Sequence, residues 1–184
     1  MLRCYHDLPS AASAVAVLRL QRLADEGLAV EFEGFETHPA ASPLPVTLDV
    51  LAERERWQDR AAALGLELAR PANVPPTALV HAIEDVARDA GLGASWRETT
   101  YRAYWEEGAD VSDHGVLAAL AQRAGLEQQE VAAVLDDPAA SARIRQRSGR
   151  RRSSGVGGVP MLEVSGALVP ADLTDEELRT LASR

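Results

Sequence analysis

Two serines three residues apart, Ser10 and Ser13 in the segment CYHDLPSAAS, are the residues whose types and spacing could do chemistry. The apolar spacing that follows predicts a helix that begins at Ser10 and ends at Glu26-Gly27. Ser10 then lies where free backbone N–H groups and the helix dipole favour an anion. A thiol bound there would be stabilised as its thiolate. The alternative is that Ser10 is simply a helix N-cap, which is worth about 1 kcal/mol.

The chain provides one thiol of its own, Cys4. A single cysteine excludes a disulfide within the chain, and thiol–disulfide exchange needs an attacking thiolate and a resolving thiol. A serine hydroxyl supplies neither. Cys4 lies in a predicted strand, Leu2–His6, where a cysteine usually packs as a small apolar residue. We therefore expect no dithiol oxidoreductase activity, and an oxidoreductase that uses Cys4 alone is the least favoured reading.

The same strand raises the question of a metal site. Cys4 and His6 are two residues apart and so point to one side of the strand, and Asp7 follows. The sequence contains no C-x-x-C or H-x-x-x-H pair that would supply further ligands. We therefore expect these side chains to pack within the protein, and we expect no metal.

Composition limits the partners. The chain has 184 residues, of which 46% are hydrophobic and 26% charged, as in an ordinary soluble globular protein. Its formal charge of −9 argues against nucleic acid, because phosphate backbones need clustered cations. We expect no membrane partner and a cytoplasmic location, since the sequence shows no secretory signal and no segment long enough to span a bilayer.

The order of predicted elements begins and ends with mixed α/β structure. The strand Leu2–His6, the helix from Ser10 and the strand Ala29–Glu36 form a β-α-β unit. The tail predicts strands Met161–Val164 and Ala167–Val169 around a Ser165-Gly166 turn, then a helix after a capping box at Thr174–Glu177. Between them the signals are helical: Leu48–Leu64, Thr77–Ala90, Ser95–Glu106, Asp113–Ala124, Glu127–Leu135 and a helix opened by Asp137-Pro138.

Two features of the helical block are open to more than one interpretation. The aromatic residues Trp96, Tyr101, Tyr104 and Trp105 fit a helical core, or a seam with the α/β unit where a ligand could bind. A dense basic run predicts a solvated helix face near acidic neighbours, with some members available to a substrate carboxylate. It consists of Arg143, Arg145, Arg147, Arg150, Arg151 and Arg152.

Three segments in this order resemble the DsbA family. HDLPSAAS has the spacing of the family pattern in which an aspartate precedes the first cysteine of C-x-x-C by three residues. GVGGVP, Gly155–Pro160, is similar to the family segment that ends in a cis-proline. AYWEEGADVSDHGVLAALAQRAGL resembles FrnE-like DsbA proteins and 2-hydroxychromene-2-carboxylate isomerases. The resemblance implies an α/β thioredoxin fold, built from residues 1–40 and 154–184, with an all-helical insertion domain over residues 41–153.

The sequence departs from the family at its centre. The two family cysteines fall on Ser10 and Ser13, and the family proline between them falls on Ala11. The isomerases and kappa-class glutathione transferases also carry a serine at the first position, so Ser10 resembles their thiol-activating serine. The resemblance further implies that Val159 and Pro160 frame a pocket with Ser10. The other reading is that this proline only shapes its loop.

Two functions remain. The favoured one is a non-redox binding module or degenerate oxidoreductase homologue that requires no cofactor and binds a protein or peptide. The alternative is an isomerase or transferase that uses glutathione or another low-molecular-weight thiol, with Ser10 and Ser13 as catalytic candidates and Ser10, Val159 and Pro160 as cofactor-binding residues. In either case we expect a homodimer.

Overall fold

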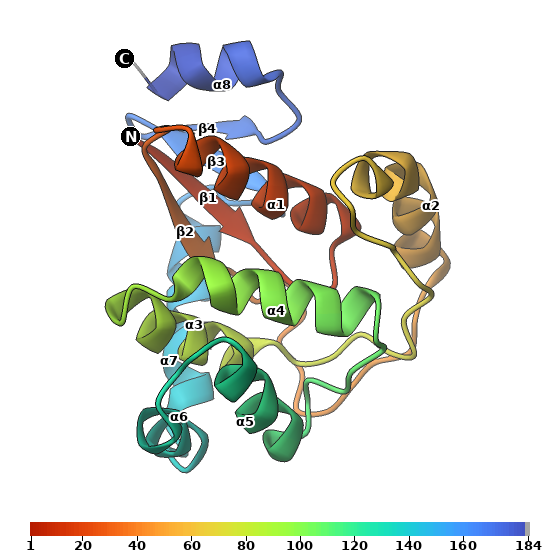
Figure 1. The fold of residues 1–184 in the computed structure, drawn as a ribbon, viewed down its shortest axis with the longest axis vertical. Helices are drawn as coiled ribbons and strands as arrows, with labels where there is room; N and C mark the ends of the chain where they lie inside the picture. Colours follow the sequence, from red (N-terminus) through yellow and green to blue (C-terminus); the bar gives the residue numbers. More distant parts are fainter. Residues whose placement is uncertain (183–184) are drawn as a thin grey trace.

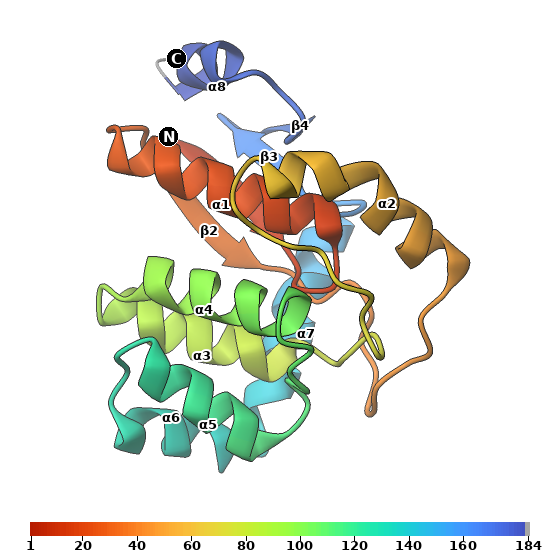
Figure 2. The same ribbon diagram turned by 45° about the vertical axis from the view of Figure 1, so that its right-hand side comes forward.

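The computed structural model describes residues 1–182, which fold around a four-stranded sheet of order β2-β1-β3-β4 (Figures 1 and 2). β1 pairs parallel with β2 and antiparallel with β3, and β4 pairs antiparallel with β3. The elements are β1 (Leu2–His6), α1 (Ala11–Asp25), β2 (Val30–Gly34), α2 (Leu48–Ala62), α3 (Ala78–Asp89), α4 (Gly93–Trp105), α5 (His114–Arg123), α6 (Gln128–Leu135), α7 (Ala140–Ser153), β3 (Met161–Val164), β4 (Ala167–Pro170) and α8 (Asp175–Ala182). This is the expected α/β arrangement, with helices between β2 and β3.

Local sequence signals explain where several elements begin. Ser10 is the N-cap of α1, and its Oγ accepts a hydrogen bond from the Ser13 N–H at 3.1 Å. Thr174 and Glu177 form the predicted capping box: Oε2 of Glu177 accepts from the Thr174 N–H at 2.7 Å, and the Thr174 Oγ1 accepts from the Glu177 N–H at 3.2 Å. β1 and β3 have the predicted bounds.

Two predictions for the helices are wrong in detail. α7 begins at Ala140 rather than at Pro138, because Oδ1 of Asp137 accepts from the Ala139 N–H at 2.8 Å and closes a turn before the helix. The apolar spacing within Thr77–Ala90 places Leu79, Ile83, Val86 and Ala90 on one side of the helix, but Ala90 is exposed in the structure. Polar residues of the same helix, His81 and Glu84, are buried instead.

The alternation of β1 divides the interior into two layers. Leu2 and Cys4 are fully buried in the main core, whereas Tyr5 faces the other side and packs with Phe35 and Val156. That second layer is covered by the end of α7, where the Arg151 guanidinium lies over the Tyr5 ring. The two faces of the central strand are therefore covered by segments far apart in sequence.

The main core runs from the sheet into the helical segment. Leu2, Val17, Trp96 and Leu117 belong to one cluster of buried side chains. Trp96 and Trp105 are fully buried, and Trp105 Nε1 donates to the Leu8 carbonyl at 3.1 Å, so the aromatic segment packs in the core at the seam between the helices and the α/β unit. The domain division at residues 40 and 154 stays a prediction, and its last two residues lie outside the described part of the chain. Within residues 1–182, no helix combines the length and hydropathy needed to cross a membrane.

Candidate functional site

Ser10 lies at the start of α1, immediately after β1 and its turn, and is 9% exposed. Its hydroxyl donates to Oε1 of Glu53 in α2 at 2.7 Å. The Ala12 N–H, in the first turn of α1, donates to the same oxygen at 3.0 Å. A carboxylate from the protein itself therefore occupies the position at the helix N-terminus that was predicted to favour a bound anion.

Ser13 lies one turn further along α1 and is fully buried. Its Oγ accepts from the Asp7 N–H at 3.4 Å, while its own N–H caps onto Ser10. These bonds tie the turn after β1 to the helix. A catalytic role for Ser13 stays a prediction.

The structure brings Ser10 and Val159 to one small pocket, of about 160 Å³. Glu53, Thr37 and His38 supply its other polar groups, and Pro9, Val50 and Val74 complete its lining. The Val159–Pro160 peptide bond is cis. Ligand sites for small molecules usually enclose about 300–1,000 Å³, so this pocket is small for glutathione.

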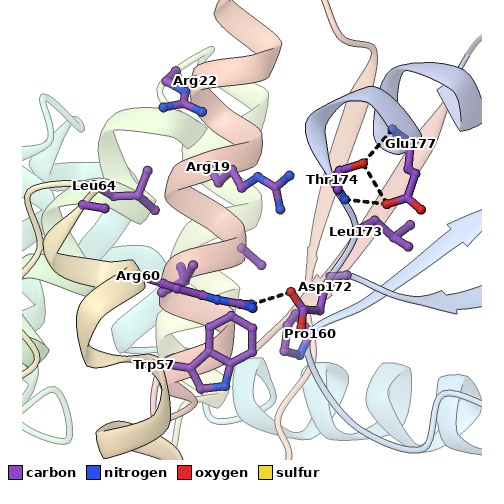
Figure 3. Close-up of a pocket in the computed structure, with 14 residues that line it drawn as sticks. Arg19, Arg22, Trp57, Arg60, Leu64, Pro160, Asp172, Leu173, Thr174 and Glu177 are labelled. Atoms are coloured by element: carbon purple, nitrogen blue, oxygen red, sulfur yellow. Dashed lines mark hydrogen bonds and ion pairs between the residues drawn. The ribbon is translucent and has the colours of Figure 1, made fainter.

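Pro160 faces a different and larger groove, of about 590 Å³, between α1, α2 and the segment that leads into α8 (Figure 3). Val15, Leu64 and Leu173 contribute apolar side chains to its lining. Arg60 extends from α2, with its guanidinium 4.7 Å from the centre of the Trp57 ring, and bonds Asp172 on the far side at 2.5 Å. The segment GVGGVP thus contributes Val159 to one cavity and Pro160 to the other.

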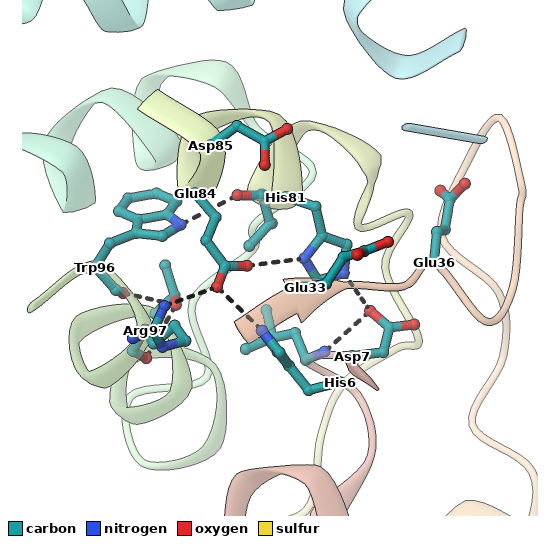
Figure 4. Close-up of polar contacts among 12 residues, drawn as sticks. His6, Asp7, Glu33, Glu36, His81, Glu84, Asp85, Trp96 and Arg97 are labelled. Carbon is teal, nitrogen blue, oxygen red and sulfur yellow. Dashed lines mark hydrogen bonds and ion pairs between the residues drawn. The ribbon is translucent and has the colours of Figure 1, made fainter. Parts of the chain in front are cut away.

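A buried network of charged side chains joins β1 and the turn after it to α3 and α4 (Figure 4). His81 lies between two carboxylates, with Nε2 2.9 Å from Oδ1 of Asp7 and Nδ1 3.3 Å from Oε2 of Glu84. Glu84 also bonds His6 at 3.0 Å and Arg97 at 3.1 Å. Asp7, at the other end, accepts from the Thr37 N–H and hydroxyl at 2.7 and 2.6 Å.

The comparisons with known proteins agree with this fold. The family model of the DSBA-like thioredoxin domain matches residues 6–181. The chain belongs to this DsbA-like family. A search of curated proteins gives no match.

Solved structures show the same fold at low identity. A probable DsbA oxidoreductase from Streptomyces coelicolor is 23% identical, with a TM-score of 0.82 over 99% of this chain and 88% of that one. A 2-hydroxychromene-2-carboxylate isomerase is 19% identical, with a TM-score of 0.74 over 92% and 87%. The cytosolic disulfide reductase DsbM from Pseudomonas aeruginosa, with GSH, is 22% identical, with a TM-score of 0.69 over 98% and 92%.

In this DsbA-like domain, burial and neighbouring charges determine the pKa values of His81, His6 and Glu84 in the buried network. Burial alone would lower the pKa of His81, but hydrogen bonds to Asp7 and Glu84 raise it to about 9. Burial lowers the pKa of His6 below its usual value. Burial would raise the pKa of Glu84, but His6, His81 and Arg97 hold it well below its usual range. At neutral pH, His81 is therefore an imidazolium between carboxylates and His6 is neutral.

The single thiol of this DsbA-like chain is inert by the same reasoning. Cys4 is fully buried, and burial raises its pKa to about 12. The thiolate that exchange chemistry needs is therefore scarce at neutral pH. Among residues 1–182, no group of three or more His, Cys, Asp and Glu side chains is arranged to hold a metal ion.

The basic run pairs largely with acidic neighbours. Arg151 donates to both carboxylate oxygens of Glu33, at 2.8 and 2.7 Å. Arg145 bonds Glu36 at 3.0 Å, and Arg147 bonds Asp85 at 2.7 Å. These pairs fasten α7 to the end of β2 and to α3.

Sequence reasoning missed Glu53, His81, Glu84 and Arg97. Glu53 lies in an arginine- and glutamate-rich helix, where it reads as a solvent-exposed charge. A histidine and a glutamate within the apolar run of Thr77–Ala90 were a usable signal, because charged residues are buried mainly when they are paired. Their partners on β1 and α4 could not be identified from one sequence.

Proposed function

We propose that this protein is a non-redox binding protein that retains the DsbA-like scaffold. One observation carries the proposal: the Ser10 hydroxyl and the Ala12 N–H both donate to the carboxylate of Glu53. A thiolate beside Ser10 would have to displace that carboxylate or face it at close range. Like charges at such distances disfavour ionisation of the thiol.

The groove beside Pro160 is the binding site in this proposal. Its volume of about 590 Å³ lies within the range of ligand sites, whereas the pocket at Ser10 lies below it. Apolar side chains from α1 and from the segments after α2 and β4 line it, together with Trp57 and Arg60 of α2. A peptide segment with an apolar anchor residue fits this lining.

The first experiment tests the thiol. Thermal unfolding is followed with glutathione and with S-methylglutathione for the wild type, Glu53→Gln and the matched control Glu55→Gln, an exposed glutamate of the same helix. We expect no glutathione-specific rise in Tm for the wild type or Glu55→Gln. A rise with glutathione, but not with its S-methylated form, in the wild type overturns the proposal.

The second experiment tests the groove. A displayed library of random peptides is selected on the wild type, and the best synthetic peptide is titrated against Leu64→Glu and Leu48→Glu. Leu64 lines the groove, whereas Leu48 is 83% exposed at the start of α2. We expect binding at least about tenfold weaker for Leu64→Glu and unchanged for Leu48→Glu. Equal affinity for both variants removes the groove from the proposal.

The second candidate is a thiol-dependent isomerase or transferase. It is favoured by the shared pocket of Ser10 and Val159, with the His38 imidazole at its edge. In this candidate, Glu53 moves aside when the thiol binds and Ser10 donates to the thiolate. The glutathione experiment above separates the two candidates. The homodimer and the cytoplasmic location stay predictions, and sedimentation equilibrium tests the first of them.

A further inference from the structure

A separate cleft, of about 460 Å³, runs along β2, an edge strand of the sheet, and the turn between α3 and α4. Four arginines from different elements line it: Arg3, Arg88, Arg97 and Arg147. Among the described residues, it shares no lining residue with the Ser10 pocket or the Pro160 groove. Four guanidinium groups therefore gather in one cleft of a chain whose net charge is −9, which is the arrangement expected of an anion-binding site.

The start of α4 lies in the wall of this cleft. Gly91 and Leu92 lead into the helix, whose first residues are Gly93 and Ala94. The N-cap position is held by Leu92, whose side chain cannot accept a hydrogen bond. The first backbone N–H groups of a helix have no intrahelical acceptor. A Cβ on Gly93 would lie 3.1 Å from Nη1 of Arg97, so glycine lets this guanidinium approach the first turn.

Arg97 is held by the interior, whereas the side chain of Arg147 is 28% exposed. Arg97 is 8% exposed and bonds Glu84 (Figure 4). Its guanidinium also bonds Gln21 and lies 3.9 Å from the centre of the Phe32 ring. Arg147 bonds Asp85, but within residues 1–182 its buried Nε and Nη2 atoms have no hydrogen-bond partner. Oε1 of Glu33 lies 3.9 Å from that Nε, beyond hydrogen-bonding distance.

The carboxylates of the cleft are already engaged by arginines. Glu33 accepts both bonds from Arg151, and Glu31 accepts from Arg3 at 3.0 Å. Arg88 bonds Asp85 at 2.8 Å, but its side chain is 50% exposed, and such surface pairs are weak enough to exchange partners. Arg88 can therefore turn to an anion that enters the cleft, and the two unpaired donors of Arg147, which are buried, reach it when that side chain rotates.

We propose that this cleft binds the phosphate group of a small phosphorylated ligand. Arginine forks and the N–H groups of a helix start are the donors that bind phosphate oxygens in proteins. The volume leaves room for an organic group beyond the phosphate, against the side chains of Val30 and Ala94. The site is independent of the proposed function at Ser10 and Pro160, so either can fail without the other.

The test uses inorganic pyrophosphate as the probe, titrated calorimetrically at low ionic strength with sodium chloride as the matched-salt control. Ala94→Asp places a carboxylate in the exposed first turn of α4. Gln129→Glu adds the same charge at the equivalent exposed position of α6. Both additions favour their helix through its dipole, so unfolding temperatures at or above that of the wild type show that the variants are folded.

We expect saturable pyrophosphate binding by the wild type and by Gln129→Glu. Binding should be at least about tenfold weaker for Ala94→Asp, and about tenfold weaker for Arg88→Gln, which loses one charge-assisted donor. Absence of binding by the wild type overturns the proposal. Equal weakening by Ala94→Asp and Gln129→Glu also overturns it, because the effect would then follow net charge and not this cleft.

Discussion

The hydroxyl of Ser10 donates to the carboxylate of Glu53 across the junction of α1 and α2, at 2.7 Å. In the C-x-x-C pattern of the DsbA family, the position of Ser10 belongs to the first cysteine. The helix start that would favour a thiolate here donates hydrogen bonds to a carboxylate of the same chain. The N-terminus of α1 still binds an anion, but that anion is the carboxylate of Glu53 in the same chain.

Substitution of the cap separates two roles of Ser10. Ser10→Ala should lower the free energy of unfolding by about 1–2 kcal/mol, since α1 loses its N-cap and Glu53 loses a donor. Ser10→Asp keeps an equally good cap but sets a second carboxylate against Glu53. We expect urea denaturation to find it less stable than the wild type at pH 7. Equal stability would mean that Glu53 does not hold this site in solution.

A thiol introduced at the helix start should report the field of Glu53. Ser10→Cys gives a thiol exposed to the helix dipole and to the carboxylate, whereas Ser10→Cys with Glu53→Gln leaves the dipole alone. We expect alkylation by iodoacetamide at pH 7 to be about tenfold faster in the double variant, because its thiol pKa is lower. The wild type gives the background from buried Cys4, and Ser10→Cys with Glu55→Gln controls for net charge. Equal rates in all three thiol variants would contradict the prediction.

The buried pair of His81 and Asp7 should make stability fall at alkaline pH. The pKa of His81 is raised to about 9 from an ordinary value near 6.5. The stabilisation is therefore fully present below about pH 6.5 and is lost as the pH rises through 9. Urea unfolding between pH 6.5 and 8.5 should show this decline in the wild type and a flatter profile in His81→Gln. Parallel profiles would argue against a charged His81.

At acidic pH, the carboxylates of Asp7 and Glu84, which both bond His81, should determine how stability changes with pH. Burial opposes ionisation of Asp7, but bonds from His81 and Thr37 hold its pKa below the usual value. Glu84 is shifted in the same direction. The two carboxylates contribute to the stability of the fold at pH values above the ordinary pKa range of carboxyl groups. This contribution is lost as the pH falls through their lowered pKa values. Asp7→Asn should flatten the acid limb of the same stability profile, whereas Asp49→Asn, an exposed residue of α2, should leave it unchanged.

The contact between β2 and α3 requires a glycine. A Cβ on Gly34 would lie 2.1 Å from Nδ1 of His81, so Gly34→Ala should displace the imidazole and lower the free energy of unfolding by about 2–4 kcal/mol. Gly149→Ala, in the interior of α7 with open space at its Cβ, should raise it by about 0.5–1 kcal/mol. Chemical denaturation of the pair measures both. An unchanged free energy of unfolding in Gly34→Ala would show that the His81 imidazole does not lie against Gly34.

Local signals were sufficient for much of the scaffold. Three local features could be predicted because each depends on residues within three positions of one another: the Ser10 cap, the Thr174–Glu177 capping box and the Ser165-Gly166 turn. Asp137-Pro138 misled for a local reason as well: the aspartate satisfied the N–H of Ala139 in a turn, and α7 began after it.

The sequence by itself determined the order of strands and helices, the missing dithiol and the serines at the start of α1. Those properties depend on residue type and on near neighbours. Only the tertiary structure decided that Glu53 reaches Ser10 from 43 residues away, and that His81 enters a buried carboxylate pair beside Gly34. Such contacts depend on how helices dock on the sheet. The free energy of docking is shared among many apolar side chains, and no single spacing in the sequence records it.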